Sequence, residues 1–143
     1  EQIGKMKDEG KLPFGQVPVL ELDDGTMLGQ SGAILSYIAA KYNLGSDDPM
    51  ATYKGESMVD LMSLDFNTKA FPKLMAAQKA ENPAEVVDGV LTEHFDSILK
   101  SVNANMPTTK FLTGDKLTVH DFRFSYIFVS IVKNPHNPLK AVW

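Results

Sequence analysis

The sequence predicts an α+β fold in which a β-hairpin and one helix precede a region built only of helices. Residues 12–42 contain two short apolar runs separated by Asp24-Gly25, followed by an apolar stripe at helical spacing. From residue 51 onward, apolar residues recur every three or four positions, the period of a helix that buries one face. We therefore expect two domains, residues 1–45 and 51–143, joined by a linker at 46–50.

The hairpin begins at Pro18. The runs Val19 to Leu22 and Thr26 to Leu28 predict its two strands, with Asp24-Gly25 as a two-residue turn. Pro18 donates no hydrogen bond to a strand ladder, so the backbone of Val17 is left free for a ligand. X–Pro bonds prefer trans by only about 0.5–1 kcal/mol, and a cis bond is compatible with this turn.

The helix after the hairpin is predicted to begin with Ser31 as its N-cap. Its apolar stripe comprises Ile34, Leu35, Ile38, Ala39 and Tyr42. The first turn of a helix has unpaired backbone N–H groups and a positive dipole end, so a carboxylate there gains about 0.3–1 kcal/mol. Gln30 and Ser31 add side-chain donors at this position.

The second region predicts a long helix over residues 51–80 and another that starts near residue 82. Pro72 should kink or break the first of these helices. Its expected apolar face contains Met58, Leu61, Met62 and Leu64. The second helix starts with Asn82 as N-cap, Pro83 at the first helical position and Glu85 completing a capping box.

A further helix is predicted after Thr118. Thr118 and Asp121 form a capping box, and Leu117 and Phe122 are placed as a hydrophobic staple across it. The residues that follow, through Val132, are apolar on nearly every side, which predicts a buried central helix. Asp121 is therefore expected to serve folding and not catalysis.

Composition excludes several classes of function. The net charge is −4 and no basic run is present, which argues against nucleic acid as a partner. The absence of cysteine excludes disulfides, thiolate nucleophiles and Cys metal sites, and His94, His120 and His136 lie far apart in the sequence. No apolar run approaches the roughly 18 residues that a membrane span requires, and no signal peptide is visible.

These residues resemble the cytosolic glutathione transferases, in particular their sigma-like, mu-like and pi-like branch. The matching stretches are Phe14-Gly15-Gln16-Val17-Pro18-Val19-Leu20, the pair Gln30-Ser31 with the helix start after it, and Gly114-x-x-x-Thr118-x-x-Asp121. The resemblance implies a partial thioredoxin-like domain followed by an all-α domain, with glutathione as a substrate.

The resemblance also implies roles for single residues. In that family the residue before the cis-proline pairs its backbone with the cysteinyl part of glutathione, as an added strand would. The Gln-Ser pair takes the γ-glutamyl carboxylate. Gln16, Val17, Pro18, Gln30 and Ser31 would then hold the tripeptide.

Three charged residues are further candidates by resemblance. Lys7 stands where the mu-like branch carries a lysine for the glycyl carboxylate, although that branch's tryptophan four residues earlier is Ile3 here. Lys11 is the alternative to Lys7, and either lysine could instead be an ordinary solvent-exposed residue without a ligand. Asp65 resembles an aspartate that reaches across a homodimer to the glutathione of the neighbouring subunit, and a solvent-facing aspartate is the alternative.

Two classes of function remain after other sites are set aside. A nucleophile elbow at Ser31 is disfavoured because Ala33 stands where that motif requires glycine. The family's catalytic tyrosine would lie upstream of Glu1, so no catalytic residue and no metal ligand is assigned. The first class is a cytoplasmic enzyme that transfers glutathione to an apolar electrophile, or uses it to isomerise or reduce one. The second is a non-catalytic binding or assembly module, as in lens crystallins and the gamma subunit of a translation elongation factor.

The sequence finally resembles the middle of the family's chain. Two strands alone are marginal in water, so the hairpin needs sheet partners that the 143 residues do not contain. We expect the helical domain to be incomplete at its C-terminal end, and the 143 residues alone not to fold cooperatively.

Overall fold

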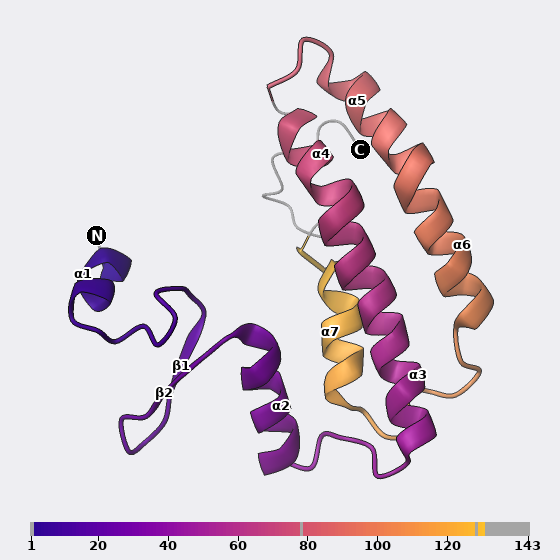
Figure 1. The fold of residues 1–143 in the computed structure, drawn as a ribbon. Helices are drawn as coiled ribbons and strands as arrows, with labels where there is room; N and C mark the ends of the chain where they lie inside the picture. The colour runs from indigo at the N-terminus through magenta and orange to yellow at the C-terminus, as the bar shows by residue number, and fades with distance from the viewer. Residues whose placement is uncertain (1, 78, 128, 131–143) are drawn as a thin grey trace. The chain divides into compact units, whose positions relative to one another are not determined.

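The computed structural model describes residues 2–77, 79–127 and 129–130. The chain divides into two compact units, Glu1–Gly45 and Ser46–Trp143. The first unit contains α1 (Gln2–Asp8), β1 (Val19–Glu21), β2 (Met27–Gly29) and α2 (Ser31–Lys41), as Figure 1 shows. The strands are antiparallel, with Val19 opposite Gly29, Leu20 opposite Leu28 and Glu21 opposite Met27.

The hairpin is present where the sequence predicts it, but its turn is longer. The Leu22 N–H donates to the Thr26 carbonyl at 2.9 Å, so Asp23, Asp24 and Gly25 form a three-residue loop in place of the predicted two-residue turn. Gly25 has φ 83°, the left-handed conformation that such loops require. The Thr26 backbone N–H donates to Asp24 and lowers the pKa of the Asp24 carboxyl below its ordinary value.

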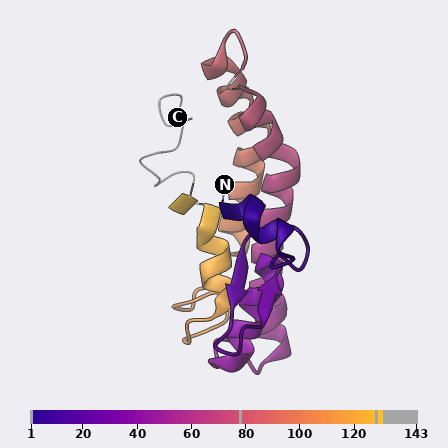
Figure 2. The ribbon, with the colours of Figure 1, turned by 90° about the vertical axis from the view of Figure 1, so that its left-hand side faces the viewer.

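The second unit consists of helices. It contains α3 (Pro49–Asp60), the π-helical segment η1 (Leu61–Ala70), α4 (Phe71–Ala77), α5 (Pro83–Val90), the π-helical segment η2 (Leu91–Phe95), α6 (Asp96–Asn105) and α7 (Val119–Ile127). Figures 1 and 2 show α3, η1 and α4 as one long helix, and α5, η2 and α6 as a second helix that runs antiparallel to it. The two long helices and α7 enclose the core of this unit.

The core stripe of the first long helix has a period of four. Met58, Met62, Phe66, Ala70 and Leu74 are all buried, and Phe66 packs edge-on against Phe95 of the second long helix at 5.7 Å between ring centroids. Leu64, which the sequence predicts to share this face, is 58% exposed, so that part of the prediction is wrong. A period of four arises because i→i+5 hydrogen bonds widen each turn of η1.

Pro72 does not break the first long helix. It occupies the second position of α4, directly after η1, and the backbone N–H of Phe71 donates to Phe66 in the π-helical pattern. Since Pro72 has no N–H to donate, a change of hydrogen-bonding pattern at this point accommodates it. The predicted break is therefore wrong.

The predicted capping of α5 is half correct. Pro83 is the first helical residue and Asn82 is the N-cap, but the Asn82 side chain makes no capping hydrogen bond. The Val86 N–H donates to the Asn82 backbone carbonyl at 3.3 Å instead.

The start of α7 is capped by the Asp121 carboxylate. It accepts from the Thr118 N–H at 2.8 Å, from the Thr118 hydroxyl at 3.1 Å and from the Leu112 N–H at 2.9 Å. One half of the predicted capping box is confirmed, the half in which the Asp121 side chain accepts from the Thr118 backbone N–H. The same carboxylate also holds the preceding loop through the Leu112 N–H. Thr118 itself is fully buried.

The predictions of a staple across this cap and of a buried helix after it are not confirmed. Leu117 and Phe122 are 38% and 52% exposed, so the staple is not a buried contact, and Tyr126 is 55% exposed. The remainder of the predicted central helix includes residues 128, 131 and 132, which lie outside the described residues, as does His136.

A polar junction joins α3 to α7. Glu56 accepts two hydrogen bonds from the Arg123 guanidinium at 2.8 and 2.9 Å, and His120 Nε2 lies 3.2 Å from the same carboxylate. Gly55 permits the close approach, because a methyl group at its Cα would lie 2.7 Å from Thr113 Cγ2 and 2.9 Å from His120 Cγ. The buried His120 ring also contacts the Thr118 hydroxyl at 3.2 Å, which links this junction to the cap of α7.

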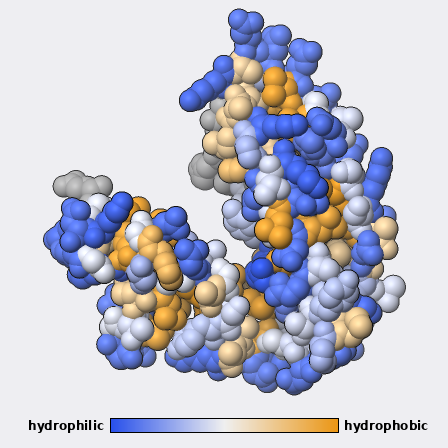
Figure 3. Space-filling model, in the orientation of Figure 1, coloured by the Kyte–Doolittle hydropathy of each residue, from blue (hydrophilic) through white to orange (hydrophobic). Residues whose placement is uncertain are grey.

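The surface of the helical unit is polar with interspersed apolar patches (Figure 3). Its exposed apolar side chains include Leu64, Phe71, Met75 and Val129. Every helix in the described part of the chain is too short or too polar to span a lipid bilayer.

Replacing Asp121 with Ala should lower the free energy of unfolding of the intact protein by about 1–3 kcal/mol, because two backbone N–H groups lose their acceptor. Urea unfolding followed by circular dichroism measures this loss. Asp115→Ala is the matched control, since Asp115 is an exposed residue of the preceding loop. Equal effects of the two substitutions would contradict a specific capping role.

Candidate functional site

The candidate site is the open end of the hairpin, where the chain enters β1 and leaves β2. Val19 pairs with Gly29, so Val17 and Pro18, just before β1, and Gln30 and Ser31, just after β2, lie at the same end of the hairpin. Val17 and Ser31, fourteen positions apart in the sequence, are both found there. The Gln30 Nε2 donates to Gln16 Oε1 at 3.3 Å, a direct contact across this end of the hairpin.

The Val17–Pro18 peptide bond is cis, which confirms the expectation from the sequence. Val17 is 52% exposed. No backbone hydrogen bond to Val17 is found within the described ranges. Its N–H and C=O are therefore available to an extended ligand, which would add to the hairpin as a further strand.

Gln30, and not Ser31, is the N-cap of α2. Its backbone has φ 67° and ψ 109°, and its side chain makes no capping hydrogen bond. Positive φ is sparsely populated by non-glycine residues and costs on the order of 1–3 kcal/mol, and such residues cluster at ligand sites. The prediction that Ser31 caps the helix is wrong, because Ser31 is already its first helical residue.

The N-terminus of α2 presents donors to solvent. Ile34 is the first residue whose N–H bonds back to the Gln30 carbonyl, at 2.9 Å, so the N–H groups of residues 31–33 precede the helical ladder. Ser31 is exposed, and the first turn contains no acidic residue. Together with the dipole, these groups form a small region that favours an anion.

Lys7 belongs to the same part of the molecule. Its Cε would lie 3.7 Å from a methyl group placed on Gly15, so the side chain of Lys7 runs beside the turn that leads into Gln16. Gly15 has φ 64°, which this turn requires. Among the described residues, the Lys7 ammonium has no hydrogen bond or ion pair.

Lys11, the alternative to Lys7, is engaged elsewhere. Its ammonium lies 2.8 Å from the Glu9 carboxylate, whose hydrogen bond and charge raise the pKa of Lys11 above the ordinary value for lysine. The chain therefore already supplies an anionic partner to Lys11. Lys7 is the better placed of the two for an anion at Gln16.

Asp65 lies in the other unit, within η1, and its carboxylate pairs with Lys69 at 3.0 Å. Its side chain is 38% exposed. This geometry agrees with a surface ion pair one helical turn apart.

Phe14 lies against the end of β2, although its role there is not predicted from the sequence. A methyl group on Gly29 would lie 2.8 Å from Phe14 Cδ2, so the ring covers the backbone at the end of β2. A glycine inside a strand pattern is the signal that could have indicated this close approach.

In the described part of the chain, no cluster of acidic or histidine side chains could hold a metal ion.

The sequence is similar to known proteins in its first part and along most of its length. Residues 5–47 match the family described as "Glutathione S-transferase, N-terminal domain". The chain is 34% identical over 128 residues to a glutathione S-transferase of Gallus gallus, covering 85% of this chain and 54% of that protein. It is 60% identical over 48 residues to glutathione S-transferase A4 of Mus musculus, covering 34% of this chain and 21% of that protein.

The fold shows the same relationship. Na-GST-3, a glutathione S-transferase of the hookworm Necator americanus, superposes with a TM-score of 0.69 and 28% identity, covering 93% of this chain and 65% of that structure. The chain spans about half the length of the curated relatives that it matches along most of its own length. By sequence and by fold, the chain is similar to members of the glutathione S-transferase family, and residues 5–47 match the N-terminal domain of that family.

Proposed function

We propose that the intact protein binds glutathione and transfers it to an apolar electrophile, or uses it to isomerise or reduce one. One observation carries the proposal: the paired strands bring the exposed backbone of Val17 and the donor-rich start of α2 at Ser31 to the same end of the hairpin. The relatives that match most of the chain are named glutathione S-transferases, which supports the enzyme over a non-catalytic assembly module.

The arrangement complements a tripeptide that has a carboxylate at each end. The γ-glutamyl carboxylate would meet the N–H groups of the first turn of α2 with the Ser31 hydroxyl and the Gln30 amide. The cysteinyl backbone would pair with Val17, next to Pro18, as a short antiparallel strand. Gln16 and the Lys7 ammonium would then face the glycyl carboxylate, at the opposite end of the ligand.

The branch of the family, the cellular location, the physiological role and the oligomeric state of the protein are also proposals. The relatives rat alpha-5 and alpha-3 have alpha-class names at 30% and 29% identity, so the similarity supports the family and leaves the sigma-, mu- or pi-like branch a prediction. A cytoplasmic location, a role in detoxification and a homodimer in which Asp65 reaches the partner's glutathione are proposed from the resemblance. The hookworm neighbour is described as monomeric, so the oligomeric state needs its own measurement by sedimentation.

Replacing Ser31 with Ala should weaken glutathione binding by about 1–3 kcal/mol, because a hydroxyl donor to a charged carboxylate is lost. Isothermal titration calorimetry on the intact protein measures the change. Ser36→Ala is the matched control, since Ser36 lies on the same helix and donates to the Gly32 carbonyl at 3.0 Å. If the wild-type protein binds no glutathione at millimolar ligand, the proposed function fails.

The two lysines should behave differently. Lys7→Met should raise the Kd for glutathione about five- to twentyfold, the size of effect that follows when a charge-assisted hydrogen bond is lost. Lys11→Met should leave the Kd unchanged, because Glu9 already pairs with that ammonium. The reverse result would assign the glycyl carboxylate to Lys11.

Gln30→Gly should separate binding from stability. Glycine adopts φ 67° without steric cost, which offsets its larger conformational entropy in the unfolded state, so the melting temperature should not fall. Glutathione affinity should fall, because the side chain that donates toward Gln16 is removed. A loss of melting temperature of several degrees with unchanged affinity would show that Gln30 serves the fold alone.

A further inference from the structure

We propose that Phe14 is a positioning residue that makes the hairpin-end site selective for glutathione over γ-glutamylcysteine, the dipeptide that lacks the glycyl residue. The inference rests on the proposed function, in which Gln16 and Lys7 face the glycyl carboxylate. Phe14 lies two positions before Gln16, in the segment that joins α1 to β1 (Figure 1). Its contact with Gly29 fixes the position of this segment on the hairpin.

The Phe14 ring lies directly against the backbone of β2. A methyl group on Gly29 would lie 2.8 Å from Phe14 Cδ2 and 3.3 Å from Phe14 Cε2. Carbon atoms in contact are most stable about 3.5–4.0 Å apart, so any side chain at position 29 would push the ring away. The contact therefore depends on glycine at this position of the strand.

Phe14 belongs to a tight turn at the start of the site. The Gly15 N–H donates to the Leu12 carbonyl at 2.9 Å, so Pro13 and Phe14 occupy the two central positions of the turn. Leu12 is buried, with 7% of its surface exposed, and anchors the start of the turn. Residues 13–18 are all exposed, so the chain between this anchor and β1 is not held by burial in a core.

Hydrogen bonding holds this exposed segment only weakly. Within the described ranges, one hydrogen bond joins residues 13–18 to the chain that follows β2, and it is the Gln30–Gln16 pair at 3.3 Å. This length exceeds the usual range of about 2.7–3.2 Å for N–H···O hydrogen bonds, and both side chains are exposed. The Phe14 ring is 61% exposed and adds little stability by burial, so its main contribution is to the position of the segment.

The position of the turn matters for one end of the ligand. Gln16 directly follows the turn, and the Lys7 side chain runs beside it, with Cε 3.7 Å from a methyl group placed on Gly15. Ser31 and the first-turn N–H groups belong instead to α2 and are placed by that helix. Loss of the Phe14 contact should therefore displace the groups that face the glycyl carboxylate and leave those that face the γ-glutamyl carboxylate in place.

The test measures the Kd of the intact protein for glutathione and for γ-glutamylcysteine by isothermal titration calorimetry. Gly29→Ala and Phe14→Ala should each raise the Kd for glutathione about five- to tenfold, the effect of weakened charge-assisted contacts to one carboxylate. The Kd for γ-glutamylcysteine should stay the same, because the dipeptide ends one residue before the groups that move. Phe14→Tyr retains the ring atoms that lie against Gly29 and should retain both Kd values.

Combining the two substitutions tests the contact itself. Gly29→Ala should have no further effect on the Kd in a protein that already carries Phe14→Ala, because the ring that the methyl group displaces is absent. Additive losses of affinity would show that Gly29→Ala acts on β2 independently of Phe14, and they would overturn the proposal.

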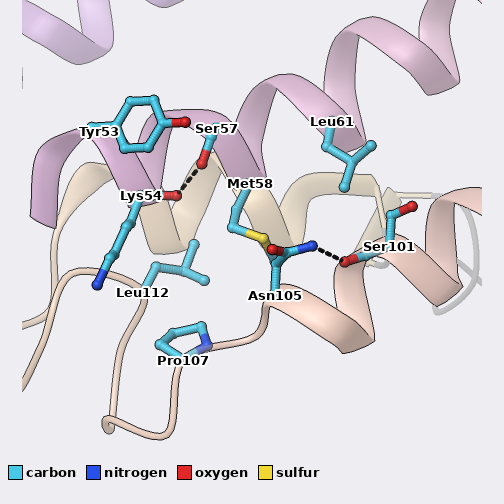
Figure 4. Close-up of a pocket in the computed structure, with 9 residues that line it drawn as sticks. All are labelled: Tyr53, Lys54, Ser57, Met58, Leu61, Ser101, Asn105, Pro107 and Leu112. Atoms are coloured by element: carbon cyan, nitrogen blue, oxygen red, sulfur yellow. Dashed lines mark hydrogen bonds between the residues drawn. The ribbon is translucent and has the colours of Figure 1, made fainter. Parts of the chain in front are cut away.

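Two control variants match these substitutions. Gly4→Ala adds a methyl group to a glycine of α1 that has no atom within 4 Å of that position apart from its own helix. Tyr53→Ala removes an aromatic ring that is 65% exposed, close to the exposure of Phe14. Figure 4 shows Tyr53 among the side chains that line a cavity in the helical unit, and every residue that lines it belongs to the second unit. Both controls should leave both Kd values unchanged.

The outcomes separate this inference from the proposed function. Since Phe14 is exposed, Phe14→Ala should keep the melting temperature of the wild-type protein, and melting curves show that each variant is folded. Equal weakening of both ligands would show that Phe14 supports the hairpin end as a whole, and an unchanged Kd for glutathione in both single variants would show that the contact has no effect. Either result overturns the proposal. Absence of glutathione binding by the wild-type protein would instead remove the proposed function, and this inference with it.

Discussion

The backbone pairing of Val19 with Gly29 is the constraint on which the candidate site depends. It fixes the register of a hairpin only three residues long on each side, and a slip of one residue would move every side chain to the other face. Because of this pairing, Val17 and Ser31 both lie just beyond the paired end of the hairpin, and neither belongs to a strand. Phe14 and the three-residue loop at Gly25 support the same register from its two ends.

Much of this end could be predicted from sequence because its signals are local. The hairpin residues, Pro18 and the start of α2 lie within thirty positions, and each follows from turn and strand chemistry. The conformation of Gln30 could not be predicted, because no local propensity favours positive φ at glutamine. The length of the turn was also missed, since Asp24-Gly25 is compatible with two-residue and three-residue loops alike.

In the helical unit, the acid that caps α7 could be predicted and the junction it supports could not. Thr118 and Asp121 are three residues apart, and that spacing is itself the signal of a cap. Glu56 and Arg123 are 67 positions apart, and nothing near either residue indicates its partner. The requirement for glycine at position 55 becomes clear only from the structure, in which Thr113 and His120 leave no room for a side chain there. Long-range pairs of this kind are the part of a fold that single-sequence patterns do not contain.

The π-helical segment η1, which lies between Met58 and Leu74, affects where insertions and deletions can be tolerated in this unit during evolution. An α-helix that gains or loses one residue normally rotates everything beyond that point by about 100° away from the core. A segment with i→i+5 hydrogen bonds holds more residues in each turn than an α-helix does, and an extra residue can be accommodated in this way. The helical turns before and after η1 therefore keep their buried side chains, such as Met58 and Leu74, on the same face. Length variation in the middle of the longest helix, where it would otherwise be least tolerated, is thus best accommodated between Leu61 and Ala70.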